Sequence, residues 1–360
     1  MAAVRAFDYA LSDSRVIFAD GALNTLGDSV DDAIGASRVL VVSTPGRALF
    51  ADRAREALGH RLAASFDKAR LHVPVDIVAQ AHDIMLACNA DCLVAIGGGS
   101  PIGLGKALSR ETGLPLVAVP TTFAGSEMTD IWGITDENGK RTGRDKRVAP
   151  KLVIYDPELT RTMPPHVAGP SGMNAIAHAV EAMYSESVSP ISSLIATEGI
   201  RLLSEALPAL SSERSESHAV ALLGAHYCAR ALDMTMMGLH HKLCHVLGGS
   251  LDLPHALTHA VVLPYATAYN APAASSAMGQ IGKGLGGVNG DDVPTQLWNL
   301  NRELGITQTL SDLGVRESDL DRIVDQATAR AYPNPREVTR AGIREILEQA
   351  MSGERPAMGE

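Results

Sequence analysis

The first 150 residues alternate short runs rich in β-branched residues with longer stretches of helical period. The runs are SRVIFAD, ASRVLVVSTPG, DCLVAIGGGS and LPLVAVPTT, and stretches such as VDIVAQAHDIMLACNA separate them. This alternation predicts a parallel sheet with helices on both faces, because parallel neighbours need a crossover helix between them. Ligands of such sheets bind at the carboxyl ends of the strands, so the loops after these runs are candidate binding sites.

The second half of the chain has a different pattern. From about residue 168 almost every segment reads at helical period, and Pro157, Pro164 and Pro165 interrupt any continuous helix just before it. A chain of 360 residues is also long for a single core. We therefore predict an α/β domain over residues 1–160 and an all-α domain over residues 161–360.

Composition excludes several classes of partner. The formal net charge of −10 disfavours binding to nucleic acid, and no window approaches the roughly 18 apolar residues that a membrane span requires. The cysteines are few and form no CxxC pair, which is typical of a reducing compartment; they are Cys88, Cys92, Cys228 and Cys244. The first residues carry no apolar signal segment. We expect a cytoplasmic protein whose partner is a small molecule.

A glycine-rich turn follows the third apolar run, in CLVAIGGGSPIGLGKALS. Gly97, Gly98 and Gly99 would let the backbone approach a phosphate, with Ser100 as N-cap and Pro101 as the first residue of the next helix. The spacing is neither GxGxxG nor that of a Walker loop. The alternative is that the glycines merely make a tight turn.

Two further loops carry polar residues. Thr121 and Thr122 end the next apolar run, and their hydroxyls could bind a ribose, an amide or a phosphate. Two polar loops at neighbouring strand ends favour a nucleotide ligand. The following segment, NGKRTGRDKR, is expected to be a solvated hairpin from which one cation could reach a cofactor; its cations are Lys140, Arg141, Arg144, Lys146 and Arg147.

Residues 238–259 hold five of the twelve histidines. Asn174 and His178 stand four apart on one predicted helix, His241 and His245 repeat that spacing on another, and His255 begins a third segment. Three helices could therefore direct imidazoles at one point. The alternative for each histidine alone is a satisfied, partly buried residue. The remaining two histidines of the stretch fall off these faces and are expected to be structural or surface residues; they are His240 and His259.

These motifs resemble the iron-containing (group III) alcohol dehydrogenase family over almost the whole chain. The resemblance rests on the GGGS turn, the PTT loop, the N-x-x-x-H helix and the HHKLCH…PH segment. It implies a dehydroquinate synthase-like architecture with an α/β NAD(P)-binding domain, an α-helical domain, a nicotinamide in the cleft between them, and a homodimer. Within the family, GGGSPIGLGKALS, PTTFAGSEMTDIWGIT and GMNAIAHAVEAMYS resemble the branch that reduces maleylacetate.

The resemblance also implies a ligand set, and one member of that set has changed. Metal-using members hold their ion with an aspartate and three histidines, which fall on Asn174, His178, His241 and His255, while His245 falls on a further histidine near the nicotinamide. A neutral amide oxygen is a poorer ligand than a carboxylate. Three imidazoles can still hold Zn²⁺, but we expect a reaction that needs no metal.

For the cofactor, the resemblance implies NADH or NADPH. Thr44 stands where NAD-selective relatives carry an acid, so a 2′-phosphate is not repelled and both coenzymes are expected to be accepted. Gly103 replaces an aspartate of many alcohol-oxidising relatives. The implied cofactor-binding residues are Thr44, Gly98, Gly99 and Ser100 at the phosphates and ribose, Thr121 and Thr122 beside the nicotinamide half, and Lys140.

The implied reaction is the reduction of maleylacetate to 3-oxoadipate in bacterial degradation of aromatic compounds. Hydride adds to a carbon conjugated with a carbonyl, and the enolate then takes a proton. His178, His241, His245 and His255 would bind and protonate this dicarboxylate, and Asn174 or Lys242 would add hydrogen bonds. Two alternatives remain: a metal-dependent alcohol dehydrogenase of the same family, and a non-catalytic nucleotide-binding sensor.

Overall fold

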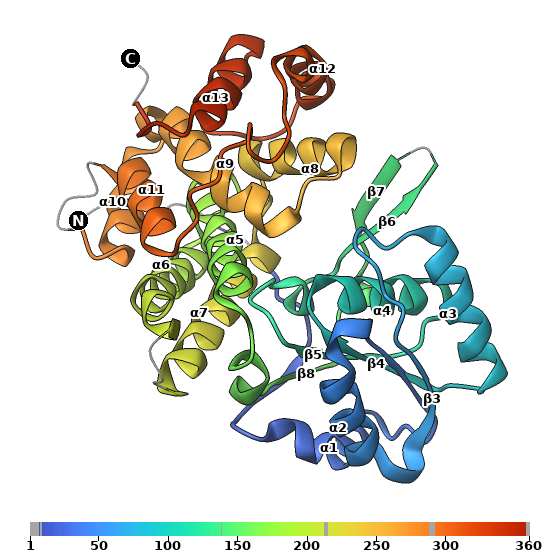
Figure 1. Ribbon diagram of the computed structural model, residues 1–360. Helices are drawn as coiled ribbons and strands as arrows, with labels where there is room; N and C mark the ends of the chain where they lie inside the picture. The colour runs from blue at the N-terminus through green and yellow to red at the C-terminus, as the bar shows by residue number, and fades with distance from the viewer. Residues whose placement is uncertain (1–6, 8, 138, 212–214, 288–291, 358–360) are drawn as a thin grey trace. The chain divides into compact units, whose positions relative to one another are not determined.

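The computed structural model describes residues 7, 9–137, 139–211, 215–287 and 292–357 (Figure 1). Contacts divide the chain into two compact units. One spans Ser12–Met163, and the other consists of Pro164–Glu360 together with the segment up to Leu11. Within the described residues, no helix combines the length and the apolar character needed to cross a membrane.

The first unit is built on a six-stranded sheet of order β1-β8-β5-β4-β2-β3 (Figure 1). Every neighbouring pair in it is parallel. The strands are β1 (Arg15–Phe18), β2 (Val39–Val42), β3 (Leu62–Phe66), β4 (Cys92–Gly97), β5 (Leu116–Pro120) and β8 (Leu152–Tyr155). The predicted parallel α/β fold is confirmed. The strands read as apolar runs because both faces of this sheet are covered.

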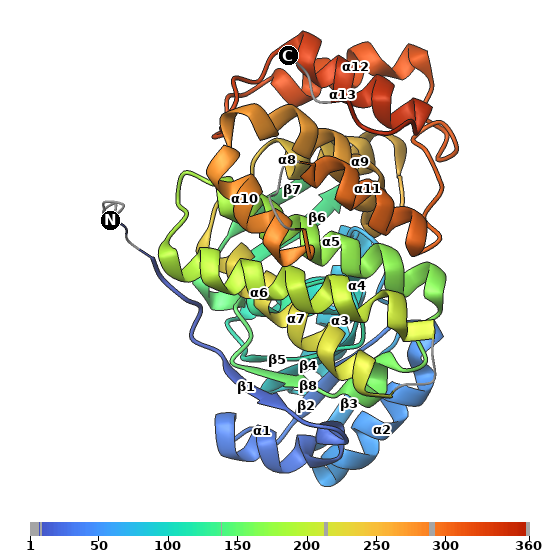
Figure 2. The ribbon, with the colours of Figure 1, turned by 90° about the vertical axis from the view of Figure 1, so that its left-hand side faces the viewer.

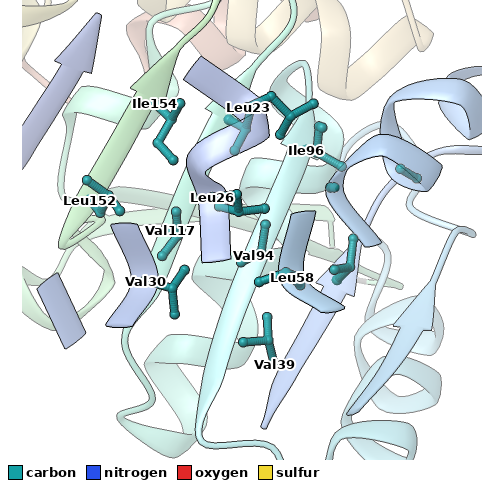
Figure 3. Close-up of a cluster of buried hydrophobic side chains, with 14 of the residues drawn as sticks. Leu23, Leu26, Val30, Val39, Leu58, Val94, Ile96, Val117, Leu152 and Ile154 are labelled. Carbon is teal, nitrogen blue, oxygen red and sulfur yellow. The ribbon is translucent and has the colours of Figure 1, made fainter. Parts of the chain in front are cut away.

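Helices cover the two faces of the sheet. The helices α1 (Leu26–Ile34) and α2 (Ala48–Leu58) pack on the face from which Val94 and Val117 project, as Figure 3 shows. The opposite face is covered by α4 (Gly99–Thr112), with α3 (Val75–Ala87) beside it. Gly105 allows α4 to lie close, since a Cβ there would stand 2.7 Å from Leu116 Cδ1. A separate antiparallel hairpin, β6 (Ile131–Asp136) and β7 (Gly139–Arg144), completes the unit.

The second unit contains only helices among its described residues. They are α5 (Pro165–Tyr184), α6 (Pro190–Ala206), α7 (Ser215–Met234), α8 (Leu239–Leu251), α9 (His255–Asn270), α10 (Ser275–Gly284), α11 (Val293–Glu303), α12 (Glu317–Thr328) and α13 (Arg340–Ser352). Helix α5 packs against α6, α7 and α9, and α8 packs against α9 and α12 (Figure 2). The predicted all-α second half is confirmed.

Helix α5 is the central element of this unit. The sequence predicts a helix from about Pro170, but α5 begins earlier, at Pro165, and contains Pro170 in its interior. Proline at the first position is favourable because that residue has no helical partner for an N–H. From Ala168 to Tyr184 every residue of α5 is buried. A helix that is buried on all sides has neighbours on all sides, so side chains on any face of α5 can contribute to a site.

Candidate active site

The glycine turn forms at the end of β4, with a shift from the predicted helix start. Gly97 ends the strand with φ 141°, and a Cβ there would lie 2.7 Å from Pro101 Cγ, so this position requires glycine. The N-cap is Gly98 and α4 begins at Gly99. The prediction that Ser100 is the N-cap is therefore wrong: the left-handed Gly97 turns the chain at once, and Ser100 is already helical. Its amide still belongs to the first turn, where anions are favoured.

The threonine loop lies against this turn. A Cβ on Gly98 would stand 3.1 Å from Thr122 Oγ1, so the two predicted cofactor-binding loops are neighbours. Thr121 is fully buried, and its hydroxyl has no hydrogen-bond partner within the described protein. Sequence reasoning missed Lys106, whose buried ammonium donates to Ser126 O at 2.6 Å, to Thr129 Oγ1 at 3.0 Å and to Ile131 O at 2.8 Å. Lys106 thus fixes the loop that carries the threonines.

The cationic segment is the predicted hairpin, and one of its cations differs from the arginines. Arg141, Arg144 and Arg147 each pair with an aspartate close by, at 3.1, 2.8 and 2.6 Å. Lys140 instead extends over Gly133, where a Cβ would stand 3.2 Å from Lys140 Cε. Burial lowers the pKa of Lys140. A partly desolvated ammonium gains most from an anionic ligand, which favours Lys140 over its neighbours as a cofactor contact. Thr44 follows β2 and is half-buried.

In the helical unit the predicted histidines converge. The rings of His178 on α5 and His241 on α8 lie 4.9 Å apart, and those of His241 and His245 lie 6.2 Å apart. The ring of His255, at the start of α9, lies 6.2 Å from that of His245. Asn174 precedes His178 by one turn and is 2% exposed, with its Oδ1 unpartnered within the described protein. Three helices therefore supply this group of side chains, as their spacing predicts.

His240 and His259 also belong to this group, so of the two expected roles, structural or surface, the surface role is excluded. Both are fully buried. The His259 ring lies 4.7 Å from that of His241, 4.8 Å from that of His240 and 4.3 Å from that of His255. The spacing of His255 and His259, four apart on α9, is the same signal that identified the other pairs. We call the six imidazoles the histidine cluster: His178, His240, His241, His245, His255 and His259.

Glu181 is the second residue that sequence reasoning missed. It lies on α5 and is fully buried, and its carboxylate accepts hydrogen bonds from the amides of Gly238 at 3.3 Å, His240 at 2.8 Å and His241 at 3.2 Å. It therefore caps α8, whose N-cap residue Gly238 has no side chain to do so. Burial raises the pKa of Glu181, and the field of His240 and the α8 amides oppose that rise.

Glu181 also sets the protonation of His241. Its Oε2 lies 2.5 Å from His241 Nδ1. Because an ionised carboxylate only accepts, Nδ1 carries the proton and Nε2 keeps its lone pair. That Nε2 is buried and unpartnered within the described protein. The carboxylate would stabilise the imidazolium if Nε2 took up a proton, as in other carboxylate–histidine pairs.

Burial in this pocket disfavours the charged form of the four innermost imidazoles. Burial, reinforced by neighbouring imidazoles, holds the pKa of His178, His241 and His259 well below 6.5, and burial lowers the pKa of His240. Desolvation of the rings therefore outweighs the attraction of the buried Glu181 carboxylate in the absence of a bound anion. Exposure increases toward one end of the cluster, where His255 is half-buried and His245 exposed.

Comparison with known proteins identifies the class. Residues 13–157 match the model of the iron-containing alcohol dehydrogenases, and residues 169–351 match that of the C-terminal part of the same family. The chain belongs to the iron-containing alcohol dehydrogenase family and is an NAD(P)-dependent oxidoreductase.

Individual relatives are more specific. The chain is 44% identical to a maleylacetate reductase of Burkholderia cepacia over 98% of its own length and 100% of that protein. It is 44% identical to one of Sphingobium indicum over 94% of its length and 96% of that protein. The crystal structure of maleylacetate reductase from Agrobacterium tumefaciens superposes with a TM-score of 0.92 at 40% identity, covering 98% of this chain and 100% of that one. The predicted resemblance is confirmed.

The residues of this chain do not fit the family's ion as metal-using relatives would hold it. Asn174 offers a neutral amide where the resemblance places an aspartate. Among the described residues, the trio whose ligand atoms all lie within 4.8 Å of one another is His240, His241 and His259, and it shares only His241 with the inherited set.

Proposed function

We propose that this protein reduces maleylacetate to 3-oxoadipate with NADH or NADPH, and that the reaction needs no metal. The observation that carries the proposal is identity of 44% over nearly the full chain to relatives named maleylacetate reductase. The amide at Asn174 supports it, since a neutral amide oxygen is a poorer ligand for a divalent ion than a carboxylate. The histidine cluster is rich in ring nitrogens and poor in charge, which suits a substrate that carries two negative charges.

The coenzyme is held by the first unit in this proposal. The α4 amides after Gly98 bind the pyrophosphate, Thr121 and Thr122 bind beside the nicotinamide half, and Lys140 neutralises one charge. Thr44 presents no carboxylate to a 2′-phosphate, which supports use of both coenzymes. When bound, the reduced nicotinamide supplies the hydride.

The histidine cluster supplies the proton. The carbon–carbon double bond of maleylacetate is conjugated with a ketone, so hydride addition at its far carbon moves the electron pair into an enolate, and a proton then closes the carbon–hydrogen bond. His241 is suited to carry that proton on Nε2, because Glu181 holds Nδ1 and stabilises the charged ring. A substrate dianion favours the charged form, so proton uptake accompanies binding.

The remaining residues position the substrate. His245 and His255, at the accessible end of the cluster, bind one carboxylate, and His178 with Asn174 binds the carbonyl end. Lys242 is half-buried next to His241 and adds a cation. No Lewis acid is required, because the ketone of the substrate accepts the electron pair, whereas oxidation of an unactivated alcohol benefits strongly from a metal-stabilised alkoxide.

A steady-state assay tests the function. Purified protein, treated with a chelator, is mixed with maleylacetate and each reduced coenzyme, and loss of absorbance at the reduced-nicotinamide band is followed. We expect turnover with both coenzymes and none with simple alcohols and NAD⁺. His241→Ala should lower kcat on the order of a hundredfold, as expected for loss of a placed proton donor, while the exposed His60→Ala control should not. Absence of turnover would favour the sensor alternative, and metal-dependent alcohol oxidation the alcohol dehydrogenase alternative.

The expected assembly rests on the family resemblance, and the expected location and partners rest on composition and charge. We propose a homodimer in the cytoplasm that binds neither nucleic acid nor membranes. Sedimentation equilibrium of the purified protein tests the dimer, and a monomer at micromolar concentration would contradict it.

A further inference from the structure

We propose that His240, His241 and His259 form a binding site for a divalent cation of the zinc class, with a ligand set that differs from the one inherited by the family. Their ligand nitrogens all lie within 4.8 Å of one another, and all three side chains are buried. The relatives' ligand positions share only His241 with this set, so the site is not the family's ion site with one ligand lost.

The protonation states of two rings are fixed from outside the site. His240 Nε2 lies 3.1 Å from the carbonyl oxygen of His259. A carbonyl only accepts, so Nε2 carries the proton and Nδ1 keeps its lone pair. In His241, Glu181 holds the proton on Nδ1, which leaves the lone pair on Nε2. Each of these two rings therefore keeps one buried nitrogen with a lone pair.

The acceptor nitrogens have no donor. His240 Nδ1, His241 Nε2 and both nitrogens of His259, of which one is an acceptor and the other a donor in the neutral ring, are buried and without a hydrogen-bond partner in the described protein. A buried lone pair without a donor is costly, and several in one place are rare in native proteins. A cation coordinated by nitrogen satisfies three of them at once, whereas a single water molecule can donate to only two.

The surroundings match those of known imidazole sites. Metal-bound histidines usually donate their second N–H to a carboxylate or a backbone carbonyl, and here Glu181 and the carbonyl of His259 accept from His241 and His240. Imidazole ligands favour Zn²⁺, Co²⁺, Ni²⁺ and Fe²⁺ over Mg²⁺ and Ca²⁺. Zinc–nitrogen bonds of about 2.0–2.1 Å place ligand nitrogens about 3.4 Å apart, so the rings need only small rotations to close on the ion.

Occupation of this site has a consequence that rests on the proposed function. An ion on His241 Nε2 removes the nitrogen that is proposed to carry the proton, so zinc should inhibit turnover rather than support it. Binding itself does not depend on that function, and the two can be measured separately.

Cobalt is the probe of choice because its visible d–d bands report coordination by nitrogen without any assay of turnover. Chelator-treated full-length protein is titrated with Co²⁺, and we expect one equivalent per chain with a tetrahedral spectrum. His259→Phe should weaken binding at least a hundredfold. The matched control, His255→Phe, removes a position of the inherited set that this site does not use, and should retain the spectrum.

Folding of each variant is checked by circular dichroism. If His259→Phe does not fold, His240→Gln replaces it, because glutamine can still donate to the His259 carbonyl but lacks the Nδ1 ligand. Loss of the bands in His255→Phe, or their retention in a folded His259→Phe or His240→Gln, would overturn the ligand assignment. Absence of Co²⁺ uptake by the wild type would overturn the proposed cation site. Failure of turnover in the chelator-treated, metal-free protein, when the same protein does bind cobalt, would refute the proposed function and leave this site standing.

Discussion

Acidification should destabilise the helical unit through the buried imidazoles. The pKa of His178, His240, His241 and His259 lies below 6.5 in the folded protein because burial disfavours the charged ring. The unfolded chain takes up protons on these rings as the pH falls below 6.5, and the folded chain does not. Their contribution to stability is therefore complete above that pH and is lost progressively below it.

The magnitude follows from the number of buried rings. For each ring that stays neutral in the folded protein, the free energy of unfolding falls by about 1.4 kcal/mol when the pH is lowered from 7.5 to 5.5. The figure follows because one pKa unit corresponds to about 1.36 kcal/mol. Four such rings give an upper bound of about 6 kcal/mol, and coupling between neighbours reduces it. Typical domains are stable by about 5–15 kcal/mol, so the effect is large enough to unfold the unit near pH 5.

Urea denaturation at the two pH values measures this loss. Trp298 lies in the helical unit and Trp132 in the other, so a Trp132→Phe background lets fluorescence report the helical unit alone. A chelator keeps metal off the imidazoles. His259→Gln should reduce the loss of unfolding free energy between the two pH values by about 1.4 kcal/mol, whatever its effect at pH 7.5. The exposed His60→Gln is the matched control. Equal pH dependence in wild type and His259→Gln would refute the argument.

Three further predictions concern the two sites. Glu181→Gln should lower kcat on the order of a hundredfold or more with little change in KM. The glutamine amide donates to His241 Nδ1 and so forces the tautomer of His241 that is protonated on Nε2. An unchanged kcat would exclude a role of the Glu181–His241 pair in catalysis. Gly97→Ala should destabilise the α/β unit by more than about 1 kcal/mol in thermal unfolding, because φ at this position is 141° and Pro101 is in the way. Lys140→Met should raise the Kd of NADH about tenfold in a fluorescence titration, because one ion pair between the ammonium and the coenzyme, of about 1.4 kcal/mol, is lost. Arg141→Met should leave the Kd unchanged, because the Arg141 guanidinium pairs with Asp136.

The α/β unit was predictable because its signal is local. Strands buried on both faces must be apolar along their length, and β2, β4 and β5 read that way in the sequence. The order of the strands was not predictable from such runs. Pairing of β1 with β8 joins residues such as Val16 and Val153, which are far apart in the chain, and nothing in either run specifies its neighbour. The helix start after Gly97 was missed because backbone conformation, and not residue preference, decided it.

The candidate active site was predicted in part for a related reason. A spacing of four identifies residues on one helix face, and it identified the faces of α5 and α8 that carry His178 and His241. It failed for His240, because α8 packs against both α9 and α12 and so buries more than one face. Glu181 was missed because a single carboxylate on an apolar helix has no sequence signature: its role comes from the amides of α8, which only the fold brings to it.

The buried charges of the histidine cluster explain how Asn174, Glu181 and the imidazoles are related. Glu181 is a buried carboxylate of the cluster, and four imidazoles around it are neutral. An aspartate at position 174 would add a second buried carboxylate on the same face of α5, two turns before Glu181, and a second buried negative charge needs a compensating positive charge. With Asn174, a single proton on His241 neutralises the pocket. In the proposed reaction, the amide at position 174 therefore removes one reason for an ion, and a proton on His241 supplies the positive charge when the substrate dianion enters.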